Sequence, residues 1–173
     1  MSIPSSTSAA AGALLMMAST QAGAAVLGPH AAACSGSAPA MLVRVEGLKT
    51  RTGLLRIQSY GGDPSRFFDK GTYLERVEIR PPAVGVVDVC LPVPRPGIYA
   101  VSVRHDVAGD RKSGLSDGGG MSGNPNISLM DIVFKRRPSP EQVAVEVRGV
   151  RRVPITLNYV RGATVGPIAS IDR

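Results

Sequence analysis

Apolar and polar side chains alternate residue by residue in short runs from residue 41 onward, and turn residues separate the runs. Successive side chains of a β-strand point to opposite faces of its sheet, so this alternation predicts strands that bury one face and expose the other. In the first run, the side chains expected to face inward are Met41, Val43 and Val45. The predicted strands are residues 41–46, 55–58, 74–80, 84–91, 98–105, 128–134, 142–148 and 153–160.

Prolines and glycines mark the ends of these strands. The pair Pro81-Pro82 precedes a nearly continuous apolar run, residues 84–91, which predicts a central strand. Three further prolines predict a stiff turn before the strand of residues 98–105. One helical turn is expected within residues 64–71, and no segment after residue 24 shows a convincing helical period.

The sequence therefore predicts an all-β fold, an antiparallel β-sandwich of about seven or eight strands, because two stacked sheets bury one-sided strands on a shared core. A length of 173 residues suits one domain, which we place at residues 41–160. Residues 161–173 are expected to form a loosely packed C-terminal extension. Aromatic residues make up 4% and tryptophan is absent, so we expect a core mainly of Val, Ile, Leu, Ala and Met.

Residues 1–24 have the composition of a signal peptide. An apolar stretch at residues 9–18 is followed by Ala22-Gly23-Ala24, a small-residue cleavage site that would leave Ala25 as the new N-terminus. The basic residues that usually precede such a stretch are missing, so the true start lies upstream or the signal is atypical. A disordered Ala/Ser tail is the alternative. We expect an exported protein of the periplasm or cell envelope.

The two cysteines, Cys34 and Cys90, are expected to form one disulfide in an oxidising compartment. The bond would tie the N-terminal segment, residues 25–40, to a strand of the sandwich and contribute roughly 4 kcal/mol by loop closure. Two thiols without a neighbouring histidine make a poor metal site. Residues 31–34 resemble a lipoprotein cleavage site, but they lie too far beyond the apolar stretch for lipidation.

The formal net charge is +7, and every Lys and Arg lies at or after Arg44. The basic clusters at residues 135–137 and 151–152 could suggest a nucleic-acid partner. No stacking platform of aromatic residues accompanies them, so we expect solvated strand faces and no nucleic acid. Weak attraction to anionic lipid or polysaccharide stays an alternative. No transmembrane segment is expected in the mature chain.

Residues 106–126 form an unusually long Gly- and Asp-rich connection, and long connections in compact domains are often functional. Asp106, Asp110 and Asp117 occupy positions one, five and twelve of a calcium-type loop. Ala108 at position three and Arg111 at position six do not suit a cation. The alternative is a loop whose Asp and Asn side chains cap its own turns. The candidate binding residues are His105, Asp106, Asp110, Asp117, Ser122 and Asn124.

His105 continues the phase of Tyr99, Val101 and Val103, so we expect it on the same face of their strand. A hydrogen-bonded scaffold role is the expected one for a single histidine there. His105 and Asp106 point to opposite faces, which argues against a Ser102–His105–Asp106 triad. We therefore predict no catalytic residues, and no cofactor apart from the calcium alternative.

The segment Pro96-Gly97-Ile98-Tyr99 running into His105-Asp106, followed by the Gly/Asp loop and by Gly120-Met121-Ser122-Gly123-Asn124, resembles domain-of-unknown-function family 2141. The resemblance covers residues 41–159. It implies an exported bacterial protein with an immunoglobulin-like or transthyretin-like sandwich and no established activity. Where the family tends to show Asn, Gly and Asp, this chain has Ala108, Arg111 and Gly114, which weakens a carried-over cation site.

Three functions follow from these observations. The leading hypothesis is a non-catalytic envelope module that contacts a glycan, a peptide or another protein through the long loop. The second is a calcium-stabilised structural module. The third is a transthyretin-like hydrolase, since Tyr159-Val160-Arg161-Gly162 loosely resembles the C-terminal signature of hydroxyisourate hydrolases. The additional histidine that such a site needs is absent.

Overall fold

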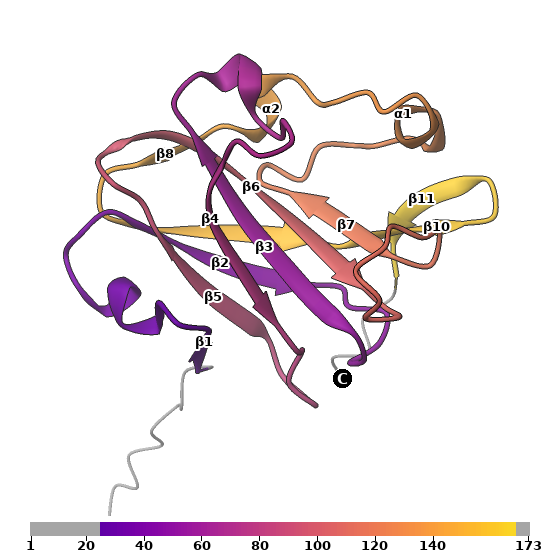
Figure 1. Ribbon diagram of the computed structural model, residues 1–173, viewed down its shortest axis with the longest axis horizontal. Coiled ribbons are helices and arrows are strands. Elements are labelled where there is room, and N and C mark those ends of the chain that lie inside the picture. The colour runs from indigo at the N-terminus through magenta and orange to yellow at the C-terminus, as the bar shows by residue number, and fades with distance from the viewer. Residues whose placement is uncertain (1–24, 169–173) are drawn as a thin grey trace, which may run out of the picture.

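The computed structural model describes residues 25–168, so the predicted signal peptide lies outside the described residues. The described chain forms two β-sheets (Figure 1). The four-stranded sheet has the order β1 (Val26–Leu27), β5 (Val87–Pro92), β2 (Ala40–Glu46) and β9 (Val150–Thr156). The seven-stranded sheet has the order β11 (Thr164–Pro167), β10 (Asn158–Arg161), β7 (Gly118–Met121), β6 (Gly97–Asp106), β3 (Leu54–Gly61) and β4 (Tyr73–Ile79), with β8 (Val145–Val147) also paired to β6.

The two sheets enclose one apolar core, as the alternating pattern predicted. Met41, Val43 and Val45 of β2 and Leu55 and Ile57 of β3 are buried in a single cluster that draws on both sheets. Full burial of an aliphatic side chain of this size contributes roughly 1.5–3 kcal/mol, so this cluster is the main source of stability. The two-sheet, mostly β architecture is therefore confirmed.

The prediction of antiparallel strands holds for the seven-stranded sheet and for the β2–β5 pair of the other sheet, and it is wrong for two strand pairs. Strand β9 runs parallel to β2, and the short β1 runs parallel to β5. The chain leaves β8 in the seven-stranded sheet, turns at Gly149 and enters β9 in the opposite sheet. This crossing places β9 alongside β2 in the same direction, which an alternation pattern cannot reveal.

Two predicted strands contain short helices instead. Residues 128–134 hold α1 (Leu129–Val133), and residues 142–148 hold the end of α2 (Pro140–Val143) before β8. Ser128 caps α1: its hydroxyl accepts from Asp131 N–H, and the Asp131 carboxylate accepts from Ser128 N–H at 2.9 Å. Such a capping box satisfies amide groups that a helix start leaves free, which favours the helical turn over a strand.

The structure adds strand β7 inside the predicted long connection, where the sequence has three consecutive glycines. A Cβ atom at Gly118 would lie 2.4 Å from the Tyr159 ring, and one at Gly120 would lie 2.6 Å from Ile155 Cγ2. The neighbouring side chains thus fill the space that the glycines leave. Glycine is a poor strand former, so propensity gave no sign of this strand.

The predicted last strand, residues 153–160, is divided between the two sheets. β9 ends at Thr156, and β10 begins at Asn158 in the seven-stranded sheet. β11 then pairs antiparallel with β10. The expectation of a loosely packed extension after Arg161 is therefore wrong for residues 164–167.

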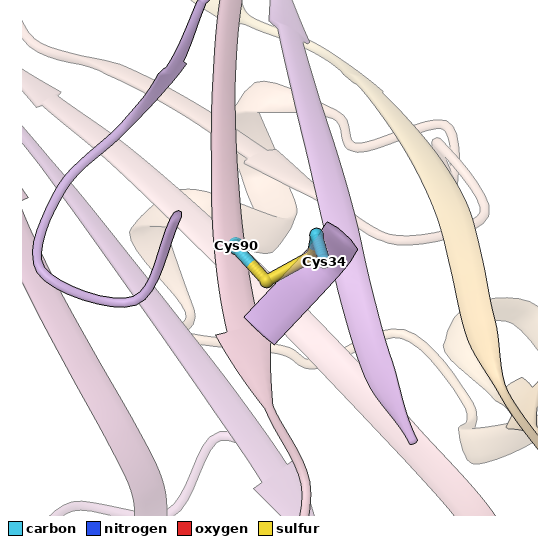
Figure 2. The surroundings of a disulfide bond; sticks show 2 residues. All are labelled: Cys34 and Cys90. Atoms are coloured by element: carbon cyan, nitrogen blue, oxygen red, sulfur yellow. A yellow bond between two sulfur atoms is a disulfide. The ribbon is translucent and has the colours of Figure 1, made fainter. Parts of the chain in front are cut away.

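The predicted disulfide between Cys34 and Cys90 is present (Figure 2), with 5.8 Å between the Cα atoms. Cys34 lies in the 3-10 helix η1 (Ala31–Ser35), and Cys90 lies in β5 on the face opposite Val89 and Leu91. The bond fixes η1 against the outer face of the four-stranded sheet. No helix in residues 25–168 has the length and apolarity that a membrane span requires.

A second, smaller apolar cluster covers the outer face of the seven-stranded sheet. It joins Tyr60, Phe67, Ala100 and Val143. Phe67 follows the 3-10 helix η2 (Pro64–Arg66), which confirms the helical turn expected within residues 64–71. Val143 belongs to α2, so the two helical turns pack on the same side of the sheet (Figure 1).

Candidate functional site

His105 lies at the end of β6 and is fully buried, on the face that the sequence predicted. Its Nε2 is 2.9 Å from the carbonyl oxygen of Thr52, and its Nδ1 is 2.6 Å from the Tyr159 hydroxyl. A carbonyl can only accept, so Nε2 carries the proton and donates it to Thr52. In the neutral imidazole Nδ1 then accepts from Tyr159. Both nitrogens of His105 are thus occupied by the fold.

The Tyr159 hydroxyl also accepts from the backbone N–H of Lys49 at 3.1 Å. Burial is the main cause that raises the pKa of Tyr159 to about 12, and the nearby Asp117 carboxylate adds to it. The phenol is therefore neutral at physiological pH, and its hydroxyl donates a hydrogen bond to Nδ1 of His105. This hydrogen-bond chain leaves no lone pair of His105 to take a proton from a substrate.

Asp106 lies on the opposite face of β6 and organises the turn that follows it. Its two carboxylate oxygens accept from Gly109 N–H at 2.8 Å and from Arg111 N–H at 2.6 Å. Carboxylates at the start of turns commonly bond to backbone amides in this way. Asp106 is 4% exposed, so its carboxylate interacts with the backbone amides of the loop and is shielded from solvent.

Asp117 holds the other end of the same loop. One oxygen accepts from Val107 N–H at 3.3 Å, and the other accepts from Gly114 N–H at 3.0 Å. The second oxygen is also 3.0 Å from Nη2 of Arg104. Arg104 donates to the Lys112 carbonyl as well. The loop is thus closed by side chains from its two ends and from the strand beneath it.

Arg104 supplies positive charge where the calcium hypothesis requires a cation. Its Nη2 is 3.9 Å from Asp106 Oδ2 and 3.0 Å from Asp117 Oδ2, so the guanidinium approaches both carboxylates. Asp110 is exposed and accepts from Lys112 N–H at 2.8 Å. Among residues 25–168, no group of three or more His, Cys, Asp or Glu side chains is placed to hold a metal ion.

Ser122 is fully buried where the partner of β6 changes from β7 to β8. Its hydroxyl accepts from Val101 N–H at 3.0 Å and donates to the Val143 carbonyl at 2.5 Å. Its own N–H donates to the Val101 carbonyl at 2.9 Å. One serine thus replaces the strand neighbour that β6 lacks at this point.

Asn124 covers the open edge of β9. Its side-chain amide donates to the Pro154 carbonyl at 3.2 Å and accepts from Thr156 N–H at 2.8 Å. These are the bonds that a neighbouring strand would make, so Asn124 shields the edge from pairing with another chain. Proline at position 154 suits the same edge, because a strand at an edge needs no donor there.

The structure brings His105, Asp106, Asp110 and Asp117 together after the end of β6, whereas Ser122 lies at the middle of β6 and Asn124 at the edge of β9. Each of the six residues is engaged in internal hydrogen bonds. What the sequence did not reveal is an apolar pocket of about 140 Å³ on the outer face of the seven-stranded sheet. Its floor comes from β7, β10 and β11 and its wall from α1 and the segment before it. The lining residues are Asp117, Gly119, Gly120, Met121, Asn124, Pro125, Ile127, Ile132, Asn158, Val160 and Val165.

Gly119 explains why this pocket exists. A Cβ atom at Gly119 would meet no heavy atom within 4 Å, whereas one at Gly118 or Gly120 would clash. The middle glycine of β7 therefore opens a gap in the outer surface of the sheet. The three glycines in the sequence were the available signal, but the placement of α1 above them depends on the tertiary fold.

A scan against protein-family models matches residues 43–154 to domain-of-unknown-function family 2141, described as an uncharacterised protein conserved in bacteria. The chain belongs to this family. The resemblance seen in the P-G-x-Y, His-Asp and G-x-S-x-N segments is thereby confirmed. Comparison with curated proteins gave no match, and neither did comparison with solved structures.

The motif residues of family 2141 have structural contacts in this chain. Tyr99 donates from its hydroxyl to the Arg95 carbonyl at 2.7 Å and so closes the proline-rich turn before β6. His105 and Asp106 organise the far end of that strand, and Ser122 bonds to Val101 in its middle. The motif thus marks how β6 is held at both ends.

Proposed function

We propose that this chain is an exported, non-catalytic binding module, and that the pocket between β7, β10, β11 and α1 receives one apolar side chain of a polypeptide partner. The observation that carries the proposal is the pocket itself. The polar candidates around it have their hydrogen bonds satisfied by the fold, while the pocket offers apolar surface that the fold leaves open. Apolar concave sites with a few polar groups are the usual form of ligand sites.

The size and lining of the pocket favour a polypeptide over a glycan among the partners expected from the sequence. Val160, Val165 and Ile132 offer no hydrogen-bond partner to the hydroxyl groups of a sugar, which would lose water without compensation. The polar lining residues Asp117, Asn124 and Asn158 already form hydrogen bonds within the fold. An apolar cavity of ~150 Å³ is large enough for benzene. A single Leu or Phe side chain therefore matches the volume, and such anchors dominate the energy of protein interfaces.

Export belongs to the same proposal. The Cys34–Cys90 disulfide supports it, because disulfides persist in oxidising compartments such as the bacterial periplasm. The signal peptide proposed for residues 1–24 would direct the chain there. An immunoglobulin-like or transthyretin-like relationship of the sandwich is also part of the proposal, and two face-packed sheets around one core are compatible with either.

The test uses the smallest mimics of a partner side chain. N-acetyl-leucinamide and N-acetyl-phenylalaninamide are titrated into isotope-labelled protein, with N-acetylserinamide as the polar control, and amide chemical shifts are followed. We expect saturable shifts at Gly119, Met121, Val160 and Val165 with the apolar probes. A Cβ atom at Gly119 has open space toward the pocket, so Gly119→Leu is designed to occupy it and is expected to abolish the shifts.

Gly149→Leu is the matched control, because a Cβ atom there also meets no heavy atom within 4 Å and Gly149 does not line the pocket. It is expected to bind the probes as the unmodified protein does. Shifts of equal size with the serine probe, or shifts that survive in Gly119→Leu, would refute the pocket as the binding site.

A further inference from the structure

The segment that follows the Ser128 cap exposes four large apolar side chains within five residues. The exposed fractions are 54% for Met130, 43% for Ile132, 61% for Val133 and 58% for Phe134. Elsewhere in residues 25–168 the exposed large apolar residues stand singly or as one adjacent pair. Figure 1 shows α1 at the periphery of the fold. A contiguous exposed apolar surface on a soluble domain indicates an interaction site.

Three basic residues follow directly, Lys135, Arg136 and Arg137, and all three are exposed. The Arg136 guanidinium lies 5.3 Å from the centre of the Phe134 ring, so charge and apolar surface are side by side. The one acidic residue within residues 130–137 is Asp131, which bonds to Ser128 and lies 4.0 Å from Nη1 of Arg136. Arg137 forms an ion pair with Asp69, so two carboxylates balance part of this positive charge, and residues 130–137 themselves keep an excess of basic over acidic side chains. Residues 130–137 are called the α1 tip below.

We infer that the α1 tip docks on an anionic lipid surface. Large apolar side chains at the end of a domain gain free energy on entering the boundary between lipid headgroups and acyl chains, and basic residues beside them are attracted to anionic headgroups. The α1 tip has both features in consecutive residues. This inference goes beyond the proposed function, which concerns a polypeptide side chain in the neighbouring pocket.

Charge argues against the other occupants of this surface. A second copy of the chain carries the same net charge of +7, so two copies would bring like-charged α1 tips together. A nucleic acid would use the basic residues, but the adjoining side chains are aliphatic except for Phe134 and give no stacking surface. An anionic bilayer matches the charge and the apolar side chains at once.

The experiment is co-sedimentation of the protein recovered from the envelope with vesicles. One set contains equal parts phosphatidylglycerol and phosphatidylcholine, and the other contains phosphatidylcholine alone. We expect binding to the anionic vesicles, weaker binding to the neutral ones, and a loss of binding as salt is raised. Free glycerol phosphate in excess is expected not to compete, because it lacks the acyl region.

Two pairs of variants separate the two contributions. Val133→Ser with Phe134→Ser removes the apolar part without changing the charge and is expected to weaken binding roughly ten-fold or more. Val84→Ser with Leu115→Ser is the control pair, since these side chains are 80% and 73% exposed at other loops. Lys135→Gln with Arg136→Gln is expected to weaken binding about five-fold per charge removed. Arg151→Gln with Arg152→Gln removes the same charge from another exposed site.

Thermal melts test whether each variant folds. Ile132 is left unchanged because it also lines the pocket. The inference is overturned if the anionic vesicles do not retain the protein, or if each control pair weakens binding as much as its partner. Equal retention by neutral vesicles would also overturn it. Gly119→Leu is expected to bind vesicles normally, so failure of the pocket proposal and failure of the lipid inference are distinguishable.

Discussion

The hydroxyl of Tyr159 and Nδ1 of His105 are 2.6 Å apart, although 54 residues separate them in the chain. Through Lys49 N–H on one side and the Thr52 carbonyl on the other, they join β10 and β6 to the segment between β2 and β3. The buried histidine of the family motif is therefore a connector between distant segments at one end of the sandwich.

Tyr159→Phe removes the centre of this connection without changing the volume of the side chain. It leaves Nδ1 of His105 and the amide of Lys49 without their partners, so we expect a loss of roughly 2–4 kcal/mol in the free energy of unfolding. Urea denaturation measures it. Tyr73→Phe, at a 37% exposed ring, is the control and is expected to change stability little. Equal effects of the two substitutions would contradict the role of the hydroxyl.

The same tyrosine predicts a loss of stability in alkali. Burial raises the pKa of Tyr159 from 10.0 to about 12, so the unfolded chain releases this proton first as pH rises. Between pH 10 and about 12 the unfolded state binds fewer protons than the folded state, and the stability contributed at this site falls with pH. Urea denaturation at several pH values in this range measures the free energy of unfolding. It should fall more steeply with pH for the unmodified protein than for Tyr159→Phe. Parallel slopes would show that Tyr159 does not titrate this way.

Ser122→Ala tests the junction in β6. The substitution leaves the amide of Val101 and the carbonyl of Val143 buried without the serine hydroxyl, and we expect a loss of roughly 2–4 kcal/mol. Ser59 is an internal control because it is equally buried but its hydroxyl has no hydrogen-bond partner in the described structure. Ser59→Ala is expected to be neutral or slightly stabilising. A large loss in both variants would point to packing instead of hydrogen bonding.

Calcium is expected to leave the melting temperature unchanged. Arg104 approaches the Asp106 and Asp117 carboxylates, and their oxygens already accept backbone amides. A ligand that binds only the folded state must raise the midpoint of unfolding, so thermal melts with millimolar calcium or with a chelator decide the question. A clear rise that Asp117→Asn removes would restore the calcium hypothesis.

Neighbouring glycines in β7 should differ sharply in their tolerance of a methyl group. Gly118→Ala places a Cβ atom against the Tyr159 ring and is expected to cost roughly 1–3 kcal/mol, the usual range for overpacking. Gly119→Ala adds a methyl group to the open pocket and is expected to be neutral. Chemical denaturation of the two variants measures the difference. Equal losses would mean that strand geometry, and not the Tyr159 contact, determines the need for glycine.

The pattern of the sequence was sufficient for features that depend on neighbours along the chain. The alternation around Met41 and Leu55 predicted which faces meet in the core, because the pleat of a strand determines where each side chain points. The phase of residues 99–105 likewise placed His105 inside. The two cysteines predicted their own pairing, since no other thiol was available.

Tertiary contacts decided the rest. The capping box of Ser128 and Asp131 favours the helix α1 in an apolar run that resembles a strand. The glycines of β7 have low strand propensity, but the Tyr159 ring packs in the space beside Gly118. The proposed binding site differs from the loop expected from the sequence for the same reason. Asp106 and Asp117 are polar in sequence but are neutralised by amides and Arg104 from the folded loop, whereas the pocket exists only where Ile132 of α1 lies over Gly119 and Val165. Hydrogen bonds and cavities arise between segments that the order of residues does not place together.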